Sequence, residues 1–279
     1  MRRFALVLAL PLLFAAALPA RAQSNTFVKQ SWSISSCNGH YGNTRSYSLF
    51  GSHRQFCELR RITLPANGEV NVRDHNGGIQ VIGRQRNTIE LEARVMVQSG
   101  SQAQAEATAH KVTIHTKGVI HADGPSAGFR GAPSWYVNYR LYVPENIAAR
   151  LHTENGGLEL RHLDGTVSGD ASNGGLTLDD VNGNVKVSTI NGGITARLQG
   201  EGWRGGGLDA ETTNGGIHVT LSRNYSAHLK AQTVNGGVSV NLPAHNQRSH
   251  GHAFEGDLGH GGPTIHFESV NGGITVGSE

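Results

Sequence analysis

Apolar and polar residues alternate in a nine-residue rhythm between Asn155 and Ala196. Within each block, apolar residues stand three and five places after a turn residue, as Leu158 and Leu160 do. A third apolar residue often follows at the eighth place, and these residues are Leu163, Val181 and Ile190. The turn residues themselves are Asn155, Asp164, Asn173, Asn182 and Asn191.

Two apolar residues separated by one polar residue share a face of a β-strand. The third apolar residue would point outward on a continuous strand, so we expect a bend between the fifth and eighth places that returns it to the core. Asn and Gly at the turn tolerate a positive φ, which predicts left-handed backbone at these corners. Two nine-residue arms then form one coil of eighteen residues.

An Asn-Gly-Gly triplet marks successive coils, and we expect its residues to be structural turns in which stacked Asn amides hydrogen-bond along the molecule. The triplets begin at Asn76, Asn155, Asn173, Asn191, Asn214, Asn235 and Asn271. A recurring unit that buries its apolar face only against its neighbours is typical of a solenoid. The sequence therefore predicts an all-β fold, a single-stranded parallel β-solenoid. The rival is an antiparallel meander, because Asn-Gly also favours hairpins.

Outside the coils, the pattern predicts more strands and one helix. Residues 89–97 and 135–143 alternate with period two, as strands do. Residues 101–111 are rich in Ala and Gln and lack Gly and Pro, which predicts a short helix. Residues 243–263 are polar and rich in glycine, so we expect a loop there.

The first 22 residues have the pattern of an export signal. Arg2 and Arg3 precede an apolar run, and Ala20-Arg21-Ala22 fits a cleavage site. The run is too short for a membrane span, and no later stretch of the mature chain is apolar enough to be one. Removal of residues 1–22 takes away three of the 24 basic residues and none of the 21 acidic ones, so the mature chain is near neutral. Nucleic acid is therefore not an expected partner.

Cys37 and Cys57 are the only cysteines. An even pair in an exported protein predicts a disulfide, which would hold a segment with little core of its own. We therefore expect three parts: the signal at 1–22, a disulfide-pinned segment at 23–55, and a β-solenoid domain at 56–279.

Two motifs carry a family resemblance: Tyr142-Val143-Pro144 before the coils, and the run from Gly259 to Pro263 before the last triplet. Together with the Asn-Gly-Gly ladder, they resemble the bacterial "putative adhesin" domain of unknown function, found in exported cell-envelope proteins. The resemblance covers residues 56–279. It implies a glycine-punctuated β-solenoid outside the cytoplasm, in the periplasm, at the cell surface or secreted, and it brings no agreed catalytic residues.

Two clusters offer binding chemistry. Aromatic residues on one strand would provide stacking surfaces for a glycan, and they are Trp135, Tyr136, Tyr139 and Tyr142. Histidines in the polar stretch near the C-terminus would bind zinc, copper or nickel, and they are His245, His250, His252 and His260. The alternative interpretations are that the aromatic strand covers the hydrophobic core, and that the histidines are exposed residues without a binding role.

The sequence contains no convergent acid–base set, so we expect neither an enzyme nor a cofactor. The leading interpretation is an exported cell-envelope scaffold or adhesin-like binding protein whose partner is an envelope glycan or protein. One alternative is a periplasmic metal-binding protein that uses the histidines at 245–260. Another is a carbohydrate-active enzyme, because parallel β-helices also host polysaccharide lyases and hydrolases.

Overall fold

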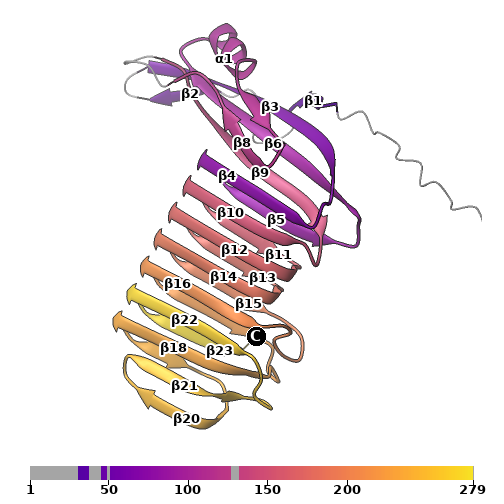
Figure 1. Cartoon of the computed structure of the whole chain (residues 1–279). Helices are drawn as coiled ribbons and strands as arrows, with labels where there is room; N and C mark the ends of the chain where they lie inside the picture. The colour runs from indigo at the N-terminus through magenta and orange to yellow at the C-terminus, as the bar shows by residue number, and fades with distance from the viewer. Residues whose placement is uncertain (1–30, 38–44, 49–50, 127–131, 279) are drawn as a thin grey trace, which may run out of the picture.

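A computed structural model describes residues 31–37, 45–48, 51–126 and 132–278 of the chain. These residues form two large β-sheets and one short helix (Figure 1). The predicted all-β class is confirmed. The predicted signal at residues 1–22 lies outside the described residues. Among the described residues, no helix combines the length and apolarity needed to cross a membrane.

The first sheet contains, in spatial order, β1 (Ser33–Ser36), β3 (Gly51–Pro65), β6 (Thr88–Ser99), β9 (Ser134–Pro144), β5 (Ile79–Arg84), β11 (Leu158–Arg161), β13 (Leu176–Asp179), β15 (Ile194–Leu198), β17 (Ile217–Leu221), β23 (Ile274–Ser278) and β19 (Val238–Val240), with β2 (Arg45–Ser48) beside β3. The second sheet contains β20 (Ala244–His250), β21 (Ala253–Leu258), β18 (Ala227–Asn235), β22 (Thr264–Asn271), β16 (Gly207–Asn214), β14 (Asn182–Asn191), β12 (Asp164–Asn173), β10 (Ala148–Asn155), β4 (Glu69–Asn76), β8 (Val119–Asp123) and β7 (Thr113–His115).

From β10 to β17 the chain gives strands alternately to the two sheets, and neighbouring strands within each sheet run parallel. Residues that pair are eighteen apart over much of this stretch, as Val167 with Val185 and Leu158 with Leu176. The paired apolar side chains face inward and are buried between the sheets. We call this set of parallel turns, together with β4–β5, β18–β19 and β22–β23, the stack.

The stack does not extend over all of residues 56–279, so the sheets are mixed rather than wholly parallel. At one end, β3, β6 and β9 pair antiparallel with one another. These strands are long and carry no Asn-Gly-Gly break, so they continue past the width of a coil and fold back on each other. At the other end, β18, β21 and β20 also pair antiparallel.

The prediction of a loop at residues 243–263 is wrong, because β20 and β21 occupy most of this stretch. Phe254, Gly256 and Leu258 alternate inward along β21 and cover the edge of β18. Their period-two pattern includes a glycine and is interrupted by acidic residues, so it does not stand out as an apolar alternation.

The last turn of the chain does not follow the order of the sequence. β22 lies between β16 and β18, and β23 lies between β17 and β19 (Figure 1). Asn271 consequently sits between Asn214 and Asn235 in space. The final 36-residue gap between triplets therefore contains the β20–β21 hairpin and a return of the chain, rather than a further coil.

The glycines of the triplets are required for a different reason than the one expected. Of the second residues of the triplets, only Gly77 has a φ in the left-handed region, at 145°. A Cβ added to Gly156 would lie 1.8 Å from the carbonyl oxygen of Gly77, and one added to Gly174 would lie 2.0 Å from that of Gly156. These positions therefore allow close approach of successive main chains. The left-handed residues other than glycine in this stretch lie at the opposite corner, at His162 and Asp180, with φ of 51° and 52°.

The two corners of a coil differ in backbone geometry, and this difference explains why the inward position expected for Ile190 is wrong. Leu163 and Val181 follow the left-handed residues and are buried, as expected. Ile190 is 52% exposed, which contradicts the expected inward position. β14 runs without a bend from Asn182 to Asn191, so Thr189 faces inward and its neighbour Ile190 faces out.

The Asn side chains form a continuous ladder at the triplet corners. Asn173 Nδ2 donates to Asn155 Oδ1 over 3.0 Å, and Asn191 Nδ2 donates to Asn173 Oδ1 over 3.0 Å. The ladder extends to Asn76 at one end and to Asn235 at the other. Each amide thus satisfies its neighbour, which stabilises the stacked corners.

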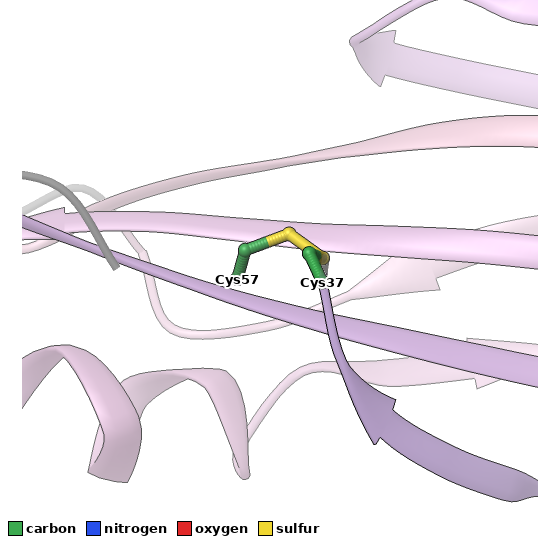
Figure 2. The surroundings of a disulfide bond; sticks show 2 residues. All are labelled: Cys37 and Cys57. Carbon is green, nitrogen blue, oxygen red and sulfur yellow. A yellow bond between two sulfur atoms is a disulfide. The ribbon is translucent and has the colours of Figure 1, made fainter. Parts of the chain in front are cut away.

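The expected helix is present as α1 (Gln102–Ala109), and the hydroxyl of Ser101 caps its N-terminus by accepting from the Gln104 amide. The disulfide between Cys37 and Cys57 is also present, and its Cα atoms are 5.6 Å apart. Figure 2 shows how it ties the chain just after β1 to β3.

We expect Gly174→Ala to destabilise the protein by about 2 kcal/mol or more, because the added Cβ meets main-chain atoms that side-chain motion cannot relieve. Gly277→Ala is the matched control, since no atom lies within 4 Å of its added Cβ, and it should stay within about 0.5 kcal/mol of the wild type. Urea denaturation measures both. Equal unfolding free energies for the two variants would contradict the close-approach explanation.

Candidate functional site

Two hollows, which together form the candidate site, lie where the antiparallel and parallel parts of the first sheet meet. β9 pairs antiparallel with β6 on one side and parallel with β5 on the other. We call this boundary the seam. A cleft of 940 Å³, the seam cleft, opens at the first triplet corner, and a groove of 360 Å³, the seam groove, lies beside it. The two share Gly78 and Asn138 as lining residues.

Trp135 and Tyr136 both line the seam cleft, but as neighbours on β9 they point to opposite faces of the strand. Trp135 packs against the main core, and Tyr136 packs against the cluster around the disulfide. Trp135 Nε1 donates to the carbonyl oxygen of Pro125 over 2.8 Å, which fixes the orientation of the indole ring. A Cβ on Gly124 would lie 2.7 Å from that ring, so the glycine lets the main chain pass close to it. The indole ring of Trp135 is therefore held in place before any ligand arrives.

The seam cleft is also lined by a buried carboxyl group, that of Asp74. Asp74 is 6% exposed, and its Oδ2 has no hydrogen-bond partner among the described residues. Burial raises the pKa of Asp74 to about 7, although hydrogen bonds from the His75 and Asn76 amides oppose the shift. The group is therefore a mixture of acid and carboxylate near neutral pH.

The position of Asp74 in the stack explains why it is unusual. Its partner in register is Thr153, whose hydroxyl donates to the Gly77 carbonyl over 2.9 Å. Thr189 and Thr212 make the equivalent bond to the glycine of a neighbouring turn. In the first turn β4, a carboxyl group takes the place of the hydroxyl.

Tyr139 is a second buried polar group at the seam. Its side chain is 2% exposed and its hydroxyl has no hydrogen-bond partner among the described residues. Burial raises the pKa of Tyr139, and the negative charges of Asp74 and Asp123 raise it further. Buried polar groups without partners are uncommon and often mark sites where function has been favoured over stability.

The seam groove is lined by polar groups that already pair with one another. Gln80 Nε2 donates to Glu159 Oε2 over 2.7 Å, and Arg140 Nε donates to Gln80 Oε1. Arg140 also lies 3.7 Å from Glu92. These contacts pair the polar side chains of the seam groove with one another. The neighbouring seam cleft, by contrast, includes Asp74, whose Oδ2 has no hydrogen-bond partner among the described residues.

The four aromatic residues expected to stack on glycans do not share one surface. Tyr136 and Tyr142 lie on the outward face of β9, whereas Val137 and Tyr139 face inward. Trp135 and Tyr136 line the seam cleft, Tyr139 lines the seam groove from below, and Tyr142 lines neither. The structure thus leaves Trp135 and Tyr136 as candidate contacts in the cleft, each on a different face of β9.

The four histidines proposed as metal ligands are exposed and spread over the β20–β21 hairpin and its flanks. His245 and His260 line a small hollow of 340 Å³ with Tyr225, and His252 Nδ1 contacts the Gly236 carbonyl at 2.5 Å. Within the described part of the chain, these residues do not form a group of three ligand atoms close enough to share an ion.

Sequence reasoning missed Asp74, although a signal was present. Val70, Val72 and Asp74 alternate along β4, so the pattern already places a charged residue on the apolar face. The cleft around it is formed in part by β9, a strand distant from Asp74 in the chain, which the local pattern does not reveal.

No family model matches the chain, and no curated protein is similar to it in sequence. Three solved structures are similar in shape at 10–12% identity. A "putative cell adhesion protein" from Clostridium sporogenes covers 79% of this chain and 99% of its own, with a TM-score of 0.43. A "putative adhesin" from Bacteroides fragilis covers 80% and 97%, with a TM-score of 0.37. A "putative lipid binding protein" from Parabacteroides distasonis covers 80% and 96%, with a TM-score of 0.23. These scores are too low for us to base any inference on them.

We expect Asp74→Asn to stabilise the protein at pH 8 and to have a smaller effect at pH 4.5. The folded-state pKa of about 7 lies above the ordinary value of 3.8, so wild-type stability falls as pH rises between these values and stays lowered above them. Removing the charge removes this cost, on the order of 1.4 kcal/mol per pKa unit.

Urea denaturation at the two pH values measures the effect. Glu106→Gln, which changes an exposed carboxylate on α1, is the matched control and should shift stability little at either pH. A difference between Asp74→Asn and the wild type that does not change with pH would contradict the assignment.

Proposed function

We propose that the protein is an exported, non-enzymatic binding scaffold with a β-solenoid body, and that it holds an envelope glycan in the seam cleft. The observation that carries the proposal is that the fixed Trp135 ring and Tyr136 line the same cleft as Asp74, whose buried carboxyl has an oxygen without a hydrogen-bond partner among the described residues.

The chemistry of the cleft suits a sugar. The apolar C–H face of a pyranose packs on aromatic rings, and its hydroxyl groups need donors and acceptors around the rim. Asp74, Asn76, Asn138 and Asn155 are among the residues that line the cleft. A half-protonated carboxyl both accepts from and donates to hydroxyl groups.

Two features support export. The disulfide between Cys37 and Cys57 is of the kind that persists in oxidising compartments outside the cytoplasm. Residues 1–22 carry the sequence pattern of a secretory signal. We propose the periplasm or the cell surface as the location.

We assign the cleft to binding rather than catalysis because of the state of its acids. Glycoside hydrolysis needs two carboxyl groups that flank one bond, one as acid and one as base or nucleophile. Asp123 also lines the cleft, but its Oδ2 lies 3.1 Å from His115 Nε2. Glu92 and Glu159 in the groove are already paired with Arg140 and Gln80. Asp74 is thus the acid that we assign to ligand binding.

The test is a glycan array followed by titration calorimetry with the glycans that the array retains. We expect Trp135→Ala and Tyr136→Ala each to weaken binding about tenfold or more, as loss of a central aromatic contact does. Tyr142→Ala is the matched control, because Tyr142 lies on the same strand but lines neither hollow, and its affinity should equal that of the wild type.

Two outcomes would contradict this proposal. One is an array on which no glycan binds, and the other is Trp135→Ala and Tyr136→Ala variants that bind as Tyr142→Ala does. Release of reducing sugar from a retained glycan would contradict the non-enzymatic part alone.

A further inference from the structure

The β7–β8 hairpin brings together metal-ligating side chains that no part of the proposed function uses. β7 and β8 pair antiparallel at the end of the second sheet, with His115 opposite His121 and Thr113 opposite Asp123. The connection is three residues long and ends at Gly118, whose φ of 74° suits a tight hairpin turn. The antiparallel pairing of β7 with β8 therefore holds His115, His121 and Asp123 in a defined arrangement.

Three ligand atoms converge on one side of this hairpin. His115 Nε2 lies 3.1 Å from Asp123 Oδ2, and His121 Nε2 lies 3.7 Å from the same oxygen. All three ligand atoms lie within 4.8 Å of one another, and no other group of three or more in the described residues meets this condition. Small side-chain rotations would bring the three atoms to the distances of about 2.0–2.2 Å that zinc needs.

A main-chain hydrogen bond orients the imidazole ring of His121. His121 Nδ1 lies 2.9 Å from the carbonyl oxygen of Val119, which can only accept a hydrogen bond. The ring therefore carries a proton on Nδ1, and in the neutral tautomer the lone pair is on Nε2, toward Asp123. This is the outer contact that metal-ligating histidines usually have, with one nitrogen on a carbonyl and the other on the ion.

The stacked rings add a second argument. The centroids of His115 and His121 are 4.6 Å apart, with 12° between the ring planes. The stacking holds both imidazoles side by side, next to the Asp123 carboxylate. Neutral imidazole is the form that binds a metal ion.

We propose that the β7–β8 hairpin binds one divalent transition-metal ion, Zn²⁺ in the first instance, through His115 Nε2, His121 Nε2 and Asp123 Oδ2. Two imidazoles and a carboxylate suit zinc and its neighbours rather than calcium or magnesium. All three side chains are 40–70% exposed, so an ion enters freely from solvent and water completes its coordination. Asp123 also lines the seam cleft, so the metal site borders the proposed glycan site, and the zinc titration is done without glycan so that the two proposals are tested separately.

The competing explanation needs no metal. A protonated His115 would form a simple ion pair with Asp123, and the second ring would stack on the first. The two explanations differ in one measurable property, which is whether zinc added to the protein binds at these three residues.

The experiment is titration calorimetry of the tag-free, disulfide-bonded full chain with ZnCl₂ alone. We expect one equivalent of Zn²⁺ to bind, and His115→Ala, His121→Ala and Asp123→Asn each to weaken binding at least tenfold. Asp123→Asn keeps the side-chain shape, so its fold should be intact, and circular dichroism of all variants checks this. Cobalt absorbance in the visible range, which reports coordination directly, should be lost in the same variants.

The double variant His250→Ala/His252→Ala is the matched control, since it removes two exposed histidines from the β20–β21 hairpin and should bind zinc as the wild type does. Absence of zinc binding to the wild type would overturn the proposal. So would binding that persists in the three hairpin variants or that is lost in the control.

Discussion

The close approach of main chains at the Asn-Gly-Gly corners is the constraint on which the rest of the structure depends. A Cβ on Gly174 or Gly192 would lie about 2 Å from a carbonyl oxygen of the preceding turn, so only glycine permits the stacking distance. The Asn amides then bond from turn to turn, and Thr or Ser hydroxyls bond to the glycine carbonyls beneath them. With the corners locked in register, the apolar side chains of each strand fall directly over those of the next.

The same constraint explains where the hollows lie. The stacking of one Asn-Gly-Gly turn on another ends at β5, whose other neighbour is the antiparallel-paired β9. Gly77 faces the carbonyl of Val137 on β9 rather than a second triplet. Around this mismatch lie the seam cleft, the seam groove and the buried polar groups Asp74 and Tyr139. The regular part of the molecule is therefore the support, and its irregular edge carries the chemistry.

Local features were predictable from the sequence because they depend on neighbouring residues. The inward leucines Leu158 and Leu160, the Asn ladder, α1 and the disulfide are of this kind. The order of strands was not predictable, because every Asn-Gly-Gly turn offers the same edge and nothing local places β22 beside β16. The site was predictable only in part: Trp135 and Tyr136 were recognised by type, but the cleft around Asp74 also depends on where β9 docks. The convergence of His115, His121 and Asp123 depends likewise on a hairpin at the edge of the sheet.

The parallel register of the stack is the central claim, and nuclear Overhauser contacts between backbone amides of isotope-labelled protein test it most directly. The account predicts contacts between residues eighteen apart across β12 and β14, such as those around Val167 and Val185, repeated between β11 and β13. Contacts between residues equidistant from Asn173, on either side of it, would show that the Asn-Gly pairs are hairpin tips. That result would contradict the stacked corners and the cleft that depends on them.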